Sequence, residues 1–174
     1  MKTCLAFAAS LLLTFMVARP ASAQGVFKVE KGEALNKIVP GNFVLEENAI
    51  PVEKRNSVLV ITPSGARMVA GLLDTSGYTS QVQEKYLGML VTEGNVEVCS
   101  KRIEVGSYGF GLAKLPGAAE GKAERFNLYN QAGHRVAECT AKWDSKLRTP
   151  RPLQVVTSGG TARFYMGRNW VELK

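Results

Sequence analysis

The strongest constraint on the fold is the way short apolar runs alternate with turn-forming residues along the chain. From Ser57 onward, most runs are five to eight residues long and rich in Val, Ile and Leu. Pro-Ser-Gly, Gly-Asn and Gly-Gly sequences separate them, as is typical of antiparallel hairpins. No stretch keeps a helical period over eleven residues or more. The sequence therefore predicts an all-β fold, an antiparallel β-sandwich of about ten short strands, with a closed up-and-down β-barrel as the alternative.

Two hairpins are the clearest local predictions. The first joins strands over Ser57–Thr62 and Ala66–Thr75 through Pro63-Ser64-Gly65, because Pro presets φ and Gly accepts a positive φ. The second joins Leu153–Thr157 to Ala162–Met166 through a turn with two glycines. A membrane barrel is disfavoured, since its strands need about 9 to 11 residues each.

The first 23 residues have the order of a secretory signal peptide. Lys2 supplies a positive start, and Leu5–Val17 is an almost unbroken apolar run. Ala21-Ser22-Ala23 then provides the small residues that a signal peptidase recognises. Cleavage after Ala23 leaves residues 24–174, which we expect to form a single β-rich domain. We therefore expect a secreted or periplasmic protein.

An uncleaved membrane anchor and a lipid anchor are the alternatives to a cleaved signal. The apolar run is thirteen residues long, whereas a spanning helix needs roughly 20. Cys4 precedes this run, whereas a lipidated cysteine would follow it, so we expect Cys4 to leave with the signal. We expect no membrane span after signal cleavage.

The cysteines that remain after cleavage form one pair, Cys99 and Cys139. In an exported protein such a pair predicts a disulfide, with free buried thiols as the alternative. Each cysteine ends a segment of alternating apolar residues, which indicates a bridge between two strands. No Cys-x-x-Cys motif occurs, so redox catalysis is disfavoured.

The chain is mildly basic. The formal net charge is +7 for all 174 residues, and +5 once Lys2 and Arg19 leave with the signal. The basic residues are scattered and no run of five or six like charges occurs, so no nucleic-acid-binding arm is indicated. Such a charge indicates a solvated surface, or attraction to an anionic partner such as a cell-envelope polymer.

Few residues suit catalysis or metal binding. His134 is the only histidine, so we expect neither a metal site nor a cofactor. A serine triad would have to use His134, and no Gly-x-Ser-x-Gly motif accompanies it. A carboxylate-based hydrolase would need two acids at a defined separation, which the sequence does not provide. The acids at predicted strand ends or edges are Asp74, Glu93, Glu97 and Asp144.

Polar and aromatic side chains make Ser76–Tyr86 the first candidate binding stretch. It combines Tyr78 and Tyr86 with short hydrogen-bonding residues, including Gln81 and Gln83. Tyrosine has an apolar ring and a polar tip, which suits carbohydrate or peptide contacts. An ordinary connection between strands, with a loop or a brief helix, is the structural alternative.

The glycine-rich stretch Gly106–Gly111 is the second candidate. In a strand, Tyr108 and Phe110 share one face, and Gly109 and Gly111 share the other. The glycine face predicts either the floor of a ligand groove or the close approach of a neighbouring backbone or ring. The glycine spacing does not match a dinucleotide-binding motif.

Four stretches of the chain resemble segments of an uncharacterised group of secreted bacterial β-sandwich-like proteins. They are Asp74–Tyr78, Gln83–Tyr86, Ile103–Leu112 and Arg151–Val155, scattered over residues 74–155. The resemblance implies a β-sandwich and export, and it implies no activity and no catalytic residue.

We therefore expect a secreted, non-enzymatic β-sandwich that binds a protein or an envelope or glycan partner. One alternative is a carrier of small apolar ligands, built as a barrel with an internal cavity. The other alternative is the carboxylate-based hydrolase.

Overall fold

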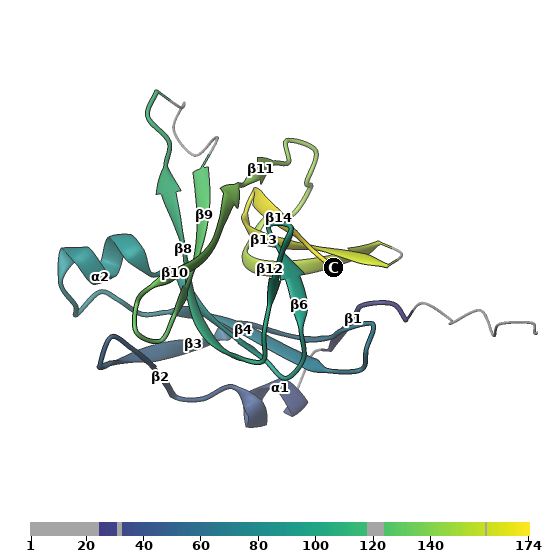
Figure 1. The fold of residues 1–174 in the computed structure, drawn as a ribbon, viewed down its shortest axis with the longest axis horizontal. Helices are drawn as coiled ribbons and strands as arrows, with labels where there is room; N and C mark the ends of the chain where they lie inside the picture. Colours follow the sequence, from purple (N-terminus) through teal and green to yellow (C-terminus); the bar gives the residue numbers. More distant parts are fainter. Residues whose placement is uncertain (1–24, 31–32, 118–123, 159) are drawn as a thin grey trace, which may run out of the picture.

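The chain folds as a β-sandwich of two antiparallel sheets in a computed structural model (Figure 1). The structure describes residues 25–30, 33–117, 124–158 and 160–174. The predicted signal peptide, residues 1–23, lies outside the described residues. The predicted all-β sandwich is confirmed.

The first sheet has eight strands in the order β1-β3-β4-β5-β8-β9-β10, with β2 paired to β3. Its hairpin between β3 and β4 turns at the predicted Pro63-Ser64-Gly65, where Gly65 has a φ of +84°. The bounds of the strands are β1 Lys28–Glu30, β2 Asn42–Leu45, β3 Asn48–Ile61, β4 Arg67–Leu73, β5 Gly88–Thr92, β8 Gly106–Lys114, β9 Glu124–Asn130 and β10 Arg135–Thr140.

The second sheet has the order β12-β13-β14-β6-β7, with β11 paired to β14. The hairpin of β6 and β7 follows β5 along the chain, yet it leaves the first sheet and pairs with β14 at Val98 and Leu173. The predicted β12–β13 hairpin is present, with Ser158 opposite Thr161. The bounds are β6 Val96–Val98, β7 Lys101–Ile103, β11 Lys142–Trp143, β12 Arg151–Ser158, β13 Thr161–Gly167 and β14 Asn169–Leu173.

The alternative of a closed barrel is wrong, because each sheet is open and ends in two edge strands. The edges are β1 and β10 in the first sheet, and β12 and β7 in the second. The described residues contain fourteen strands rather than about ten. The added strands are short, because β1, β2, β7 and β11 have only two to four residues each.

Both faces of the first sheet are covered along β4 and β5. Val58 and Val60 on β3 face the second sheet, whereas Leu59 faces a layer formed by β2, helix α1 (Glu33–Ile38) and helix α2 (Ser80–Lys85). β4 is therefore buried at six consecutive positions, as expected of a strand with both faces covered. Neither helix of the described chain has the length and apolarity that crossing a bilayer requires.

Three phenylalanines fill the centre between the sheets. Phe110 on β8 lies 5.1 Å from Phe164 on β13, in an edge-to-face arrangement of the rings. Phe126 on β9 lies 6.1 Å from Phe110 and 6.4 Å from Phe164. All three rings are fully buried, and aromatic pairs of this kind add about 0.5–1.5 kcal/mol each beyond the buried area.

The predicted disulfide is present between Cys99, in the β6–β7 turn, and Cys139 on β10. It links the two sheets, since β6 and β7 belong to the second sheet and β10 is an edge of the first. The cysteines are separated by 40 residues, and in a chain-entropy model a loop of that length stabilises the fold by about 4 kcal/mol.

The end of α2 packs against the glycine face of β8, formed by Gly109 and Gly111. Of the two predictions for this face, the close approach of a neighbouring backbone or ring is therefore the one observed. A Cβ on Gly109 would lie 2.7 Å from the ring of Tyr86, and a Cβ on Gly111 would collide with the carbonyl oxygen of Lys85. Tyr86 is buried directly after the last helical residue. The two glycines therefore let α2 pack against the sheet.

Gly111→Ala is expected to lower the free energy of unfolding by about 1–3 kcal/mol, because the colliding oxygen belongs to the backbone of α2. Gly41→Ala is the matched control, since its Cβ would meet open space, and its effect should stay within about 0.5 kcal/mol. Urea denaturation of both variants measures the difference. Equal midpoints for the two variants would contradict the packing of α2 on the glycine face.

Candidate functional site

Three of the six predicted binding residues pack within the protein. Phe110 is fully buried between the sheets, and Tyr108 is partly buried against the same cluster. The Tyr108 hydroxyl donates to the carbonyl of Glu104 at 3.0 Å. Tyr86 is buried on the opposite face of the first sheet. The sheet therefore separates Tyr86 from the other two.

The remaining three predicted residues lie on or beside α2. Tyr78 donates from its hydroxyl to the carbonyl of Ala49 at 2.6 Å, and Gln83 donates to the carbonyl of Tyr78 at 2.8 Å. Tyr78 thus links the segment before α2 to β3, and Gln83 links α2 to that segment. Gln81 is exposed, and with Gln83 it lines an open groove that also contains Tyr129.

A charged cluster beside this groove clamps α2 to the β2–β3 turn. Lys85 pairs with Glu46, and its Nζ lies 5.2 Å and 4.9 Å from the ring centroids of Tyr86 and Tyr129. The Tyr86 hydroxyl donates to the same Glu46 oxygen at 2.6 Å. These two donors, Lys85 first, hold the pKa of Glu46 below its ordinary value of 4.5, and burial raises the pKa of Tyr86. The carboxylate of Glu46 and the ammonium group of Lys85 neutralise each other, so we interpret this cluster as a structural contact.

The four acids considered for hydrolysis are engaged by four different partners. Within the described residues, no group of three His, Cys, Asp or Glu side chains lies close enough to hold a metal ion. The partners are Ser76 for Asp74, Arg67 for Glu93, Lys174 for Glu97 and Tyr165 for Asp144.

The edge of β14 that faces β11 and β6 contains an opening that no sequence motif predicts. On this edge β11 pairs with Trp170 and β6 pairs with Leu173, while Glu172 lies between the two. No strand of the described chain pairs with Glu172 there, because Cys99 and Ser100 turn away at φ values of 56° and 57°. We call this opening the ladder gap, and it encloses a cavity of about 160 Å³.

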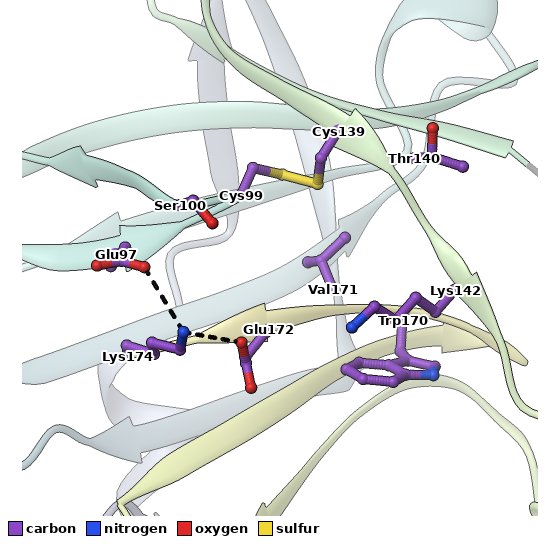
Figure 2. A pocket seen from close by; sticks show the side chains of 10 residues that line it. All are labelled: Glu97, Cys99, Ser100, Cys139, Thr140, Lys142, Trp170, Val171, Glu172 and Lys174. Atoms are coloured by element: carbon purple, nitrogen blue, oxygen red, sulfur yellow. Dashed lines mark ion pairs between the residues drawn. A yellow bond between two sulfur atoms is a disulfide. The ribbon is translucent and has the colours of Figure 1, made fainter.

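Figure 2 shows the surroundings of the ladder gap. The Cys99–Cys139 disulfide and Val171 form an apolar side. Lys174 lies at the second side, with its Nζ 3.1 Å from Glu172 and 4.0 Å from Glu97. The remaining lining residues are Ser100, Thr140, Lys142 and Trp170.

Trp170, at the third side, carries two cations. Lys142 lies opposite it on β11, with Nζ 4.8 Å from the centroid of the indole ring. Arg163 on β13 places its Cζ 4.4 Å from the same centroid. Arg163 is 4.0 Å from the Asp144 carboxylate, and Lys142 forms no ion pair within the described chain. We call Lys142, Trp170 and Arg163 the cationic stack, in which the indole holds two positive groups close together.

The positive charge of the chain is concentrated in this sheet. Residues 141–174, which form β11 to β14, contain seven Lys and Arg against two acids. Residues 24–140 contain thirteen of each. The net charge of +5 expected after signal cleavage therefore lies entirely in the C-terminal 34 residues.

The sequence contains part of the signal for this site. It predicts core or rim packing for Trp143 and Trp170, with a sugar-binding platform as the alternative, and the structure places Trp170 at a partly exposed rim. Alternation along β14 puts Trp170 and Glu172 on the outer face, since Val171 and Leu173 are buried. The cations come from two other strands, so no single window of sequence contains the site.

Comparisons of the chain with protein-family models, with curated proteins and with solved structures gave no match. We therefore infer function from the ladder gap and the cationic stack.

The Glu46 clamp makes a pH-dependent contribution to stability. Because the folded-state pKa of Glu46 is lowered, its contribution is complete above the unfolded-state pKa of about 4.5 and is lost as pH falls through the folded-state value. Glu46→Gln should cost about 1–2 kcal/mol at pH 7, since the side chain is 30% exposed. The cost should shrink below pH 4.

Glu47→Gln is the matched control, because Glu47 occupies the same turn at a positive φ and is exposed. Thermal melts of the three proteins between pH 3 and pH 7 measure the effect. An equal cost of Glu46→Gln at every pH would show that the clamp does not depend on the carboxylate charge.

Proposed function

We propose that the protein is an exported, non-enzymatic binding module that attaches to an anionic polymer of the cell envelope. The binding surface is the outer face of the second sheet, centred on the cationic stack. The observation that supports this most directly is the position of Lys142 and Arg163, both within 4.8 Å of the centroid of the Trp170 ring. Two cations on one rigid support suit a partner with repeated negative charges.

The electrostatics of the stack favour a polyanion over a single ion. Contact with the indole restricts both long side chains before binding, so less conformational entropy is lost on association. The surrounding segment, residues 141–174, adds the whole excess of positive charge. Exposed charges of one sign raise the local concentration of an oppositely charged polymer, and salt weakens the effect.

Export is supported by the predicted signal peptide and by the Cys99–Cys139 disulfide. Disulfides persist in oxidising compartments such as the periplasm or the exterior of the cell. The resemblance to secreted β-sandwich proteins points to the same location.

The proposal does not include hydrolysis, because the candidate acids already bind partners within the protein. Glu93 accepts two hydrogen bonds from Arg67, and Asp144 accepts one from Tyr165. The carrier alternative needs a hollow interior, and the space between the sheets holds the rings of Phe110, Phe126 and Phe164. A surface function is therefore favoured over both alternatives.

Binding to polygalacturonate, an acidic polysaccharide, tests the proposal. The double variant Lys142→Gln and Arg163→Gln should weaken binding about tenfold, since each lost contact costs about 0.5–1 kcal/mol. Affinity should also fall as salt is raised from 50 to 300 mM. Biolayer interferometry on the protein purified after signal cleavage measures both effects.

The matched control is Lys54→Gln with Arg55→Gln, which removes the same charge from exposed positions on β3. It should change the affinity less than threefold. Equal losses in the two double variants would indicate attraction by net charge alone and would overturn the proposed surface. If the native protein showed no measurable binding to polyanions, the proposed function itself would be overturned.

A further inference from the structure

The backbone of Glu172 points into the ladder gap. Residues of one strand direct their N–H and C=O groups to alternate edges of the sheet. Lys174 exchanges two hydrogen bonds with Glu97 on this edge, at 2.7 and 3.0 Å, and Arg168 accepts one from the Asp144 N–H at 3.0 Å. Glu172 has the same parity, so its N–H and C=O face the same edge.

In the part of the chain that the structure describes, the neighbouring positions on this edge are paired and Glu172 is not. Trp170 lies opposite Lys142 on one side, and Lys174 bonds to Glu97 on the other. Within the described chain, no backbone group bonds to Glu172 at this edge. The gap is thus a missing rung, with one donor and one acceptor placed as a neighbouring strand would require them.

A secondary amide is the group that matches a missing rung. It offers one C=O to the N–H and one N–H to the C=O, as a strand residue does. A carboxylate would satisfy the N–H alone and would face the carbonyl oxygen unfavourably. The cavity of about 160 Å³ is well above the roughly 10–15 Å³ that a single water needs on the same measure, so it has room for an acetamido group.

The walls of the gap fit the rest of such a group. Val171 and the disulfide form an apolar surface for a methyl group, and Ser100 and Thr140 offer hydroxyls to a sugar ring. Lys142, which forms no ion pair within the described chain, stands at one side of the opening, whereas Lys174 on another side is paired with Glu172 and Glu97. An acidic group on the neighbouring sugar would lie close to Lys142.

We propose that the ladder gap recognises the acetamido group of N-acetylated amino sugars within an acidic polysaccharide. This inference rests on the proposed function, because it names the chemical class of the same anionic polymer. The cationic stack binds the acid groups, and the gap reads the amide beside them.

Hyaluronan and polygalacturonate oligosaccharides of equal length separate the two proposals. Hyaluronan alternates an acidic sugar with an N-acetylated one, whereas polygalacturonate has an acid on every sugar and no acetamido group. We expect at least fivefold tighter binding of hyaluronan in calorimetry, despite its lower charge. Equal or weaker binding of hyaluronan would overturn the acetamido site and leave the proposed function standing. Binding of neither would overturn both.

Glu172→Pro removes the backbone N–H that faces the gap. Proline is accepted at sheet positions whose N–H does not enter the ladder, so the variant should keep its fold by circular dichroism. It should lose the preference for hyaluronan, while Glu172→Gln, which keeps the N–H and removes the same charge, should retain it. Thr140→Trp, at an exposed lining position, fills the gap without changing any residue of β14. Thr140→Trp should also abolish the preference for hyaluronan. This second variant tests the site even if Glu172→Pro does not fold.

The amide of Glu172 gives a direct readout in the native protein. Its hydrogen exchange should be fast in the free protein and at least tenfold slower with saturating hyaluronan octasaccharide. The Glu97 amide, already bonded to Lys174, should change little and serves as the internal control. An unchanged Glu172 amide under saturation would contradict the proposed site.

Discussion

The disulfide between Cys99 and Cys139 ties the β6–β7 hairpin of the second sheet to β10 of the first. The β6–β7 hairpin has only three residues in each strand, and its sheet contact to β14 is limited to the pair Val98–Leu173 and the bonds of Glu97 to Lys174. So short a contact is weak in isolation. The covalent link holds the hairpin turn beside β10, and the same turn forms one side of the ladder gap. Structure and candidate site therefore share one constraint.

Among the described residues, two hairpin turns have positive φ angles at both central residues without containing glycine. They are Glu46-Glu47 and Cys99-Ser100, and such positions cost of order 1–3 kcal/mol for residues with a Cβ. In each turn the first residue makes a strong tertiary bond that offsets the strain. Glu46 binds Lys85 and Tyr86, and Cys99 binds Cys139. A glycine would relax these turns and remove the contact that each one positions.

Local chemistry made part of the structure predictable. The turn at Pro63–Gly65, the cysteine pair and the two faces of β8 follow from residue types at short spacing. The departure of β6 and β7 to the second sheet does not, because Val98 finds its partner at Leu173. The ladder gap was equally hidden, since it arises where two strands diverge from a third. Trp170 was visible in the sequence, while its cations lie on other strands.

The pairing of β6 with β14 also has a kinetic consequence. Val98 and Leu173 are 75 positions apart, so the second sheet cannot close until the chain between them has been made and has folded. Contacts of such long sequence separation form late and slow folding. Until β14 is available, the backbone N–H and C=O groups on the free edges of β6 and β7 are unpaired. Unpaired strand edges of this kind can pair with other chains. The disulfide needs only Cys99 and Cys139, so oxidation can fix the hairpin turn beside β10 before β14 is available.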